Sequence, residues 1–191
     1  MRMSQLFVGS RRTFLARAGA ITMGTGAAGI LTGIGVTQSL AQGQGDIGVI
    51  QTALALEHEG IAAYEIAGKS GLLSAGTLKV ALVFMGHHQA HRDALAKLVT
   101  QAGGKPVERK SDAAYTTELN LGRLTTEADV IALATRLEHG AAGAYISQIS
   151  ALKDPKLARL FAQISADEAT HWAALNGAAG KPSPTTAFMF G

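Results

Sequence analysis

The sequence of 191 residues contains no cysteine and few aromatic residues. Without cysteine the protein has no disulfide framework, no thiolate metal site and no thiol nucleophile. Phenylalanine, tryptophan and tyrosine together make up only 5% of the chain, whereas alanine and glycine are abundant. A chain of this length and composition is expected to form one domain, in which closely packed helices surround a hydrophobic core.

Acidic residues are also absent from the beginning of the chain, where arginine is the only charged residue type before Asp46. An uncharged stretch from Ala18 to Val36 follows these arginines, which is the layout of an export signal. The stretch is nearly long enough to be a transmembrane anchor, but its many glycines and threonines make it a poor one. The arginines are Arg2, Arg11, Arg12 and Arg17.

The segment SRRTFLARAG at 10–19 resembles the twin-arginine consensus, and Ser39–Ala41 offers a cleavage site of small residues. We therefore expect residues 1–41 to be a signal peptide and the protein to be periplasmic. The net charge of +3 then belongs to the signal, because removing its four arginines leaves 13 basic and 14 acidic side chains, a net charge of −1. No nucleic-acid partner is expected, and membrane contact is expected only during export.

Helical periodicity begins at Asp46 and continues through two neighbouring stretches. The first runs to about Ala67 and ends at GKSG (68–71), and the second runs from Ala75 to about Ala102 and ends at GGKP (103–106). The short turn between them predicts an antiparallel pair of helices.

A second helix pair is predicted after residues 103–124, which have no sustained period and form a long crossover with room for a short helical turn. Its first helix begins at the capping residues Thr125–Asp129 and runs to about Leu152. Its second helix begins at Asp154–Pro155 and runs to about Gly177, and the tail from Gly180 is irregular.

The two predicted pairs repeat each other in sequence. LEHEGIAAY at 56–64 corresponds to LEHGAAGAY at 137–145, and HHQAHRDALAKL at 87–98 corresponds to DEATHWAALNGA at 167–178. The sequence GKP follows each pair. This correspondence indicates an internal duplication.

Three glutamates and three histidines fall inside the apolar stripes of the four predicted helices, by the 3.6-residue period. Burying an unpaired carboxylate costs several kcal/mol, so these groups need a shared partner, and a bound cation is the simplest one. All six histidines of the chain lie in the repeated segments. The six predicted ligands are Glu57, His88, His91, Glu138, Glu168 and His171.

Residues Asp46–Gly180 resemble the ferritin-like superfamily, in particular carboxylate-bridged bundles such as rubrerythrin and bacterioferritin. The resemblance implies an all-α, four-helix bundle built from two helix pairs with one long crossover, over residues 42–180, followed by a tail at 181–191. It also implies two iron or manganese ions that react with O₂ or peroxide. Glu57 and Glu138 match the family's single glutamates, and Glu168 with His171 matches its E-x-x-H motif. A looser resemblance links the chain to bacterial ferritin-like proteins exported by the twin-arginine route.

His88 departs from the family pattern, because it stands where the family places a glutamate that bridges the two metals. The departure leaves open an asymmetric dinuclear centre, a mononuclear centre, a metal other than iron, such as zinc or copper, or a lost site. His87 is an alternative ligand, because it lies four residues before His91.

Two further pairs of residues flank the predicted ligands. His58 and His139 follow the glutamates by one residue and either support the ligands or have a structural role. Tyr64 and Tyr145 share the glutamates' faces and are candidates to hydrogen-bond a ligand carboxylate.

The competing hypothesis is a metal-free bundle with a buried, hydrogen-bonded polar layer. Two functions therefore stay open, a metal-dependent oxidoreductase and a non-catalytic module for metal sequestration or stress protection. The sequence leaves the oligomeric state undetermined, with a dimer among the options.

Overall fold

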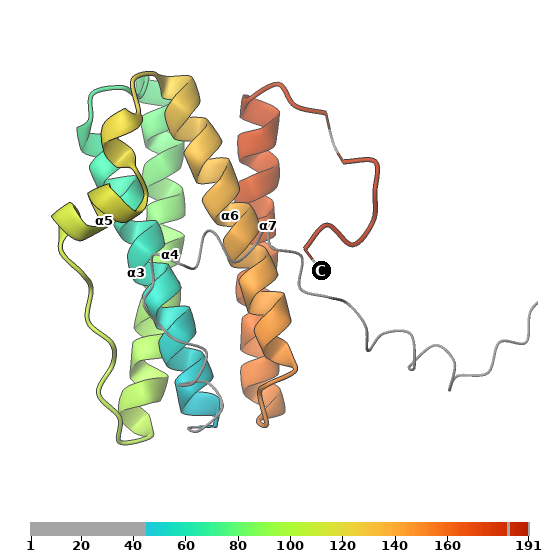
Figure 1. The fold of residues 1–191 in the computed structure, drawn as a ribbon. Coiled ribbons are helices and arrows are strands. Elements are labelled where there is room, and N and C mark those ends of the chain that lie inside the picture. The colour runs from blue at the N-terminus through green and yellow to red at the C-terminus, as the bar shows by residue number, and fades with distance from the viewer. Residues whose placement is uncertain (1–44, 183, 191) are drawn as a thin grey trace, which may run out of the picture.

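The computed structural model describes residues 45–182 and 184–190, so the predicted signal peptide lies outside the described residues. The described chain is helical and has no strand. Four long helices run antiparallel within two hairpins, and two short helical segments lie between the hairpins (Figure 1). The elements are α3 (Asp46–Lys69), α4 (Ala75–Gln101), α5 (Asp112–Glu118), η1 (Leu121–Arg123), α6 (Glu127–Ile149) and α7 (Pro155–Ala178).

Capping residues fix the starts of three of the long helices. Ser74 accepts a hydrogen bond from the Thr77 amide at the start of α4. Thr126 forms a reciprocal capping box with Asp129 at the start of α6. Asp154 caps α7 ahead of Pro155, which needs no hydrogen-bond acceptor for its nitrogen. These caps confirm the predicted order of four helices, with ends within about three residues of those expected.

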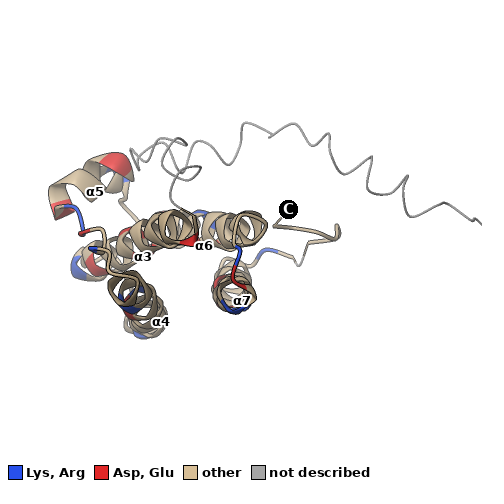
Figure 2. Ribbon diagram, turned by 90° about the horizontal axis from the view of Figure 1, so that it is seen from below, with Lys and Arg blue, Asp and Glu red and all other residues tan. Residues whose placement is uncertain are grey.

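The two hairpins are each tightly packed and meet mainly along α3 and α6. Figure 2 shows α3 and α6 side by side, whereas α4 and α7 stand apart. The apolar core fills the end of the bundle where α3 begins and α4 ends, and Leu54, Leu95 and Phe161 are fully buried there. This packing fixes the helices relative to one another at one end of the bundle, and thereby positions the polar side chains near the middle of the helices.

The crossover between the hairpins is more ordered than the sequence predicts, because it contains both α5 and η1. It runs along α3 (Figure 1). Gln51 on α3 hydrogen-bonds the Lys105 carbonyl and the Val107 amide, each at 2.7 Å. Arg109 reaches Glu65 on α3 at 3.0 Å. These side-chain contacts hold the segment against α3, although the segment has no hydrophobic periodicity.

The first residue of each hairpin accepts hydrogen bonds from the turn of the other hairpin. Asp46 accepts hydrogen bonds from the amides of Lys153 and Asp154, at 2.8 and 3.0 Å, in the α6–α7 turn. Glu127 accepts hydrogen bonds from the amide and hydroxyl of Ser74, at 2.9 and 2.8 Å, in the α3–α4 turn. The predicted duplication is therefore visible in the contacts as well as in the sequence.

In its described residues the tail after α7 is irregular and folds back against α6 and α7. The Phe190 ring lies 5.1 Å from that of His139 and 5.2 Å from that of Trp172, measured between centroids. None of the helices between residues 45 and 182 is long and apolar enough to cross a membrane.

Candidate metal centre

The structure brings all six predicted ligands together in the middle of the bundle. Each of the four long helices supplies at least one of them from its inward face. The glutamates are almost completely shielded from solvent, with exposed fractions of 1% for Glu57, 2% for Glu138 and 0% for Glu168. Carboxylates buried this deeply need compensating positive charge.

One group of four side chains, which we call site A, comprises Glu57, His88, His91 and Glu168. His88 Nδ1 lies 2.8 Å from Glu57 Oε2, and His91 Nδ1 lies 3.1 Å from Glu168 Oε1. The remaining imidazole–carboxylate distances in this group are 3.6 and 3.7 Å. One ligand atom from each residue thus borders a common small space.

A second group, which we call site B, comprises His88, Glu138, Glu168 and His171. His88 Nε2 lies 3.3 Å from Glu138 Oε1. His171 Nδ1 lies 3.3 Å from Glu138 Oε2 and 3.1 Å from Glu168 Oε2. The E-x-x-H pair on α7 therefore meets the single glutamate of α6, as the family resemblance implies.

Two residues belong to both sites. Glu168 directs Oε1 to site A and Oε2 to site B, and His88 directs Nδ1 to site A and Nε2 to site B. The family resemblance assigns this shared position to a glutamate. His88 can also contact both sites, because an imidazole has two nitrogens on opposite sides of its ring. His87 does not take its place, since it belongs to neither site.

The repeated tyrosines act across the duplication. Tyr64 on α3 donates a short hydrogen bond to Glu138 on α6, and Tyr145 on α6 donates one to Glu57 on α3. Each half of the repeat therefore orients the glutamate of the other half. Burial, followed by the neighbouring carboxylate charge, raises the pKa of both tyrosines well above the usual value, so both remain hydrogen-bond donors.

On the second helix of each hairpin, the residue just before the predicted ligands contacts a histidine of the other hairpin. Asp167 on α7 lies 3.2 Å from His91 Nε2, and His87 on α4 lies 2.9 Å, through Nδ1, from His171 Nε2. Each histidine thus has its outward nitrogen engaged, which orients the ring and directs the other nitrogen inward. Sequence reasoning missed Asp167, although its place before Glu168 matches that of His87 before His88.

His58 and His139 lie outside both sites. His58 Nε2 lies 3.1 Å from the Val107 carbonyl of the crossover. His139 is exposed and packs against Trp172 and Phe190. Both histidines follow a buried glutamate by one residue, and the helical twist turns their side chains to the edges of the bundle.

The acidic and basic groups of the centre shift each other's protonation. Burial opposes ionisation of Glu57 and Glu138, but hydrogen bonds from histidines keep the pKa of each below its usual value. Burial dominates at Glu168 and raises its pKa. Although burial opposes their charge, contacts with the glutamates raise the pKa of His91 to about 10 and that of His171 to about 9. Protons on the imidazoles therefore balance the carboxylates, and a cation that bound here would replace those protons.

Glu59 is a buried acid that sequence reasoning did not single out. Its exposed fraction is 4%, and its Oε2 atom has no hydrogen-bond partner among residues 45–182 and 184–190. Burial, aided by the charge of Glu118 and opposed by that of Lys110, raises its pKa to about 7. The only signal in the sequence is a second glutamate in LEHEG, which is missing from the corresponding LEHGA.

The donor set fits divalent transition metals. Carboxylate oxygens with imidazole nitrogens suit iron, manganese and zinc. Among the described residues, two buried atoms of site A, His91 Nδ1 and Glu168 Oε1, form an ion pair at 3.1 Å but make no hydrogen bond of good geometry. A cation bound to both atoms would satisfy them more fully than this ion pair does.

Comparison with known proteins agrees with the fold. Residues 45–181 match the profile of the ferritin-like domain. A conserved hypothetical protein from Mycobacterium tuberculosis, rv2844, has a similar fold, with a TM-score of 0.62 and 21% identity over 73% of this chain and 94% of that one. No curated protein matches the sequence. The match to the profile spans all four long helices and every predicted ligand, and the chain therefore belongs to the ferritin-like domain family.

Proposed function

We propose that this protein is a metalloprotein that holds two divalent ions, iron or manganese, at sites A and B and reacts with O₂ or peroxide. The observation that carries the proposal is the sharing of His88 and Glu168 between two groups of four ligand residues. When bound, such a pair of redox-active ions supplies electrons to O₂ or peroxide.

The residues of the chain have distinct tasks in this proposal. Glu57 and His91 bind at site A, Glu138 and His171 bind at site B, and the two shared residues hold the sites together. Tyr64 and Tyr145 fix the carboxylates of Glu138 and Glu57. Both tyrosines keep a proton beside the centre, because their raised pKa prevents ionisation.

Access to the centre supports a reactive site over a closed store. A cavity of about 750 Å³ reaches His88 and Glu138 from one end of the bundle. Small molecules entering through it would meet site B first. A structural polar layer has no need of such an opening.

The test is metal content and metal-dependent stability of the purified protein. We expect bound iron or manganese by elemental analysis, and a higher melting temperature after Fe²⁺ or Mn²⁺ is added. Glu138→Ala, which removes a residue of site B only, should reduce the rise, whereas Glu108→Ala, which changes an exposed glutamate of the crossover, should leave it intact. A native protein without metal and without a metal-dependent rise would refute the proposal. A protein that binds metal but consumes neither O₂ nor peroxide would instead be a sequestering module.

We also propose that residues 1–41 direct export to the periplasm by the twin-arginine route. The support is the paired arginines, the uncharged stretch and the small residues before Gln42. Because this route carries folded proteins, metal would be loaded before transport. Changing Arg11 and Arg12 together to lysine should leave an unprocessed precursor in the cytoplasm, detected by fractionation and immunoblotting. Normal cleavage and export of that double variant would contradict the assignment.

A further inference from the structure

The end of the bundle opposite the apolar core is hollow. The core cluster lies where α3 begins and α7 begins, whereas the cavity of about 750 Å³ lies where α3 ends and α7 ends. Protein interiors are normally packed as densely as organic crystals, and cavities of this size are characteristic of ligand sites. The cavity is therefore a feature that packing does not explain.

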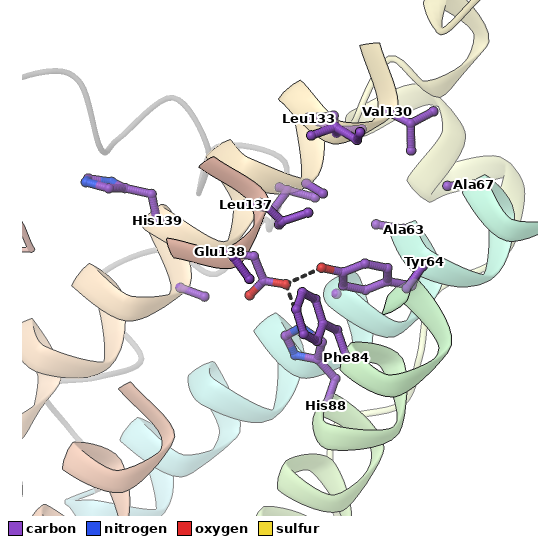
Figure 3. A pocket seen from close by; sticks show the side chains of 18 of the residues that line it. Ala63, Tyr64, Ala67, Phe84, His88, Val130, Leu133, Leu137, Glu138 and His139 are labelled. Atoms are coloured by element: carbon purple, nitrogen blue, oxygen red, sulfur yellow. Dashed lines mark hydrogen bonds and ion pairs between the residues drawn. The ribbon is translucent and has the colours of Figure 1, made fainter. Parts of the chain in front are cut away.

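Small side chains keep the cavity open. The wall contributed by α3 includes Ala63 and Ala67, and the wall contributed by α6 includes Ala134 and Ala141. The larger side chains of Val130, Leu133 and Leu137 line the α6 wall without filling the space (Figure 3). An apolar space of this kind favours an apolar occupant over water, because water there would find few hydrogen-bond partners.

Three polar groups of the cavity lie together at its inner end, and the lining also includes Glu59, Ser74, Thr77, His139 and Ser147. Figure 3 shows Tyr64, His88 and Glu138 grouped there, with the Tyr64–Glu138 and His88–Glu138 interactions drawn between them. Most of the remaining wall is aliphatic or aromatic. A ligand that matches this distribution has a hydrocarbon body and one hydrogen-bonding group that faces Glu138.

The charges along the wall further restrict the ligand. Among the described residues that line the cavity there is no lysine or arginine, whereas two are glutamates, Glu59 and Glu138. Both nitrogens of His88 are already engaged by Glu57 and Glu138, so an anionic head group, such as a fatty-acid carboxylate, would face these acids without a free cationic side chain to pair with. An uncharged molecule avoids that cost.

The C-terminal tail borders the cavity from outside. Met189 and Phe190 contribute to its lining, and the Phe190 carbonyl lies close to Gly143 on α6, where an added Cβ atom would be 3.5 Å from it. The tail thus adds further apolar surface to the space between the hairpins.

We propose that this cavity binds an uncharged, hydrocarbon-rich small molecule whose single polar group lies beside Glu138 and His88. Its further role, as the substrate or electron donor of the metal centre, rests on the function proposed above. Binding itself does not, because the walls come from the helices rather than from any ion.

The test uses the full chain and the uncharged fluorescent probe N-phenyl-1-naphthylamine, with 1-dodecanol and dodecanoate as competitors. We expect saturable binding of the probe, and displacement by 1-dodecanol at a concentration at least about tenfold lower than by dodecanoate, which corresponds to about 1.4 kcal/mol. Equal displacement by both competitors, or no saturable binding, would overturn the proposal.

Variants locate the binding in the cavity. Ala134→Phe and, separately, Ala63→Phe should weaken probe binding at least about tenfold, whereas Ala162→Phe on the exposed side of α7 should not. Unchanged affinity in a folded cavity variant would overturn the proposal. Metal content is measured on the same samples, so the two proposals fail separately. Probe binding to a protein that takes up no metal would refute only the metal centre, and metal uptake without probe binding would refute only the cavity ligand.

Discussion

Gly60 shows how a single residue controls the geometry of the centre. It lies within α3, where glycine costs about 1 kcal/mol relative to alanine. A Cβ atom at this position would lie 3.1 Å from two atoms of the His88 ring. The absence of a side chain at Gly60 therefore lets His88 occupy the position that both sites share.

Gly60→Ala should displace the His88 ring and reduce metal content, because a displaced ring cannot serve both sites. Gly86→Ala is the matched control, since an added Cβ on that exposed glycine of α4 meets nothing within 4 Å. The control should retain metal and gain up to about 1 kcal/mol of stability. Elemental analysis and chemical denaturation measure both effects. Equal metal content in the two variants would contradict the role given to Gly60.

Glu59 should make stability depend on pH in a specific window. Its folded pKa of about 7 is raised above that of an unfolded glutamate, so its contribution is complete below about pH 4 and is lost as the pH rises through 7. Glu59→Gln should therefore exceed the native protein in free energy of unfolding at pH 8 by roughly 1–3 kcal/mol, and the difference should shrink at pH 5.

Urea denaturation at the two pH values measures this difference. Glu108→Gln serves as the control because Glu108 is fully exposed, and its effect should be small at both values. A difference between Glu59→Gln and the native protein that stays constant from pH 5 to pH 8 would mean that Glu59 is ionised throughout.

At the scale of helices, reciprocal hydrogen bonds between the hairpins add to the hydrophobic packing that holds them together. Asp46 bonds two amides in the α6–α7 turn, so Asp46→Ala should reduce the free energy of unfolding by about 1–2 kcal/mol. Asp93→Ala removes an exposed acid that pairs with its neighbour Arg92, and should cost less than about 0.5 kcal/mol. Chemical denaturation measures the free energy of unfolding of both variants. Equal decreases would show that the hydrogen bonds of Asp46 to the α6–α7 turn do not stabilise the fold.

The sequence predicts the four long helices well, because their ends carry local chemical signals. Thr126 with Asp129 and Asp154 with Pro155 specify helix starts through contacts within a few residues. The crossover is less predictable, since α5 depends on contacts such as that of Lys110 with Glu118 and that of Arg109 with Glu65. The contact with Glu65 joins the crossover to α3, so it depends on tertiary structure and leaves no local signal in the sequence.

The candidate site, too, is predicted by the sequence only in part. Helical period alone places the six predicted ligands on inward faces, because each lies within an apolar stripe. The pairing of Tyr64 with Glu138 and of Tyr145 with Glu57 depends on how the two hairpins dock, which a one-dimensional pattern does not contain. The same holds for the cavity, because its volume depends on how far apart the hairpins lie.

For the whole molecule, the duplication explains why one small chain carries nearly the same segment twice. Each hairpin supplies a glutamate, a tyrosine and a second helix with a motif of two ligand residues. Neither hairpin completes a site alone, since Glu57, His91 and His88 meet Glu168 from the other hairpin. The centre therefore exists only where the two halves meet.

The most direct test of this account is the electron paramagnetic resonance spectrum of the native protein loaded with Mn²⁺, recorded with the metal-to-protein ratio of the same sample. Two groups that share His88 and Glu168 should take up two ions per chain, close enough for their spins to couple. We therefore expect a ratio near two and a coupled spectrum, which Glu168→Ala converts to a lower ratio without coupling. No bound Mn²⁺, or two ions with the spectrum of isolated Mn²⁺, would contradict a shared centre.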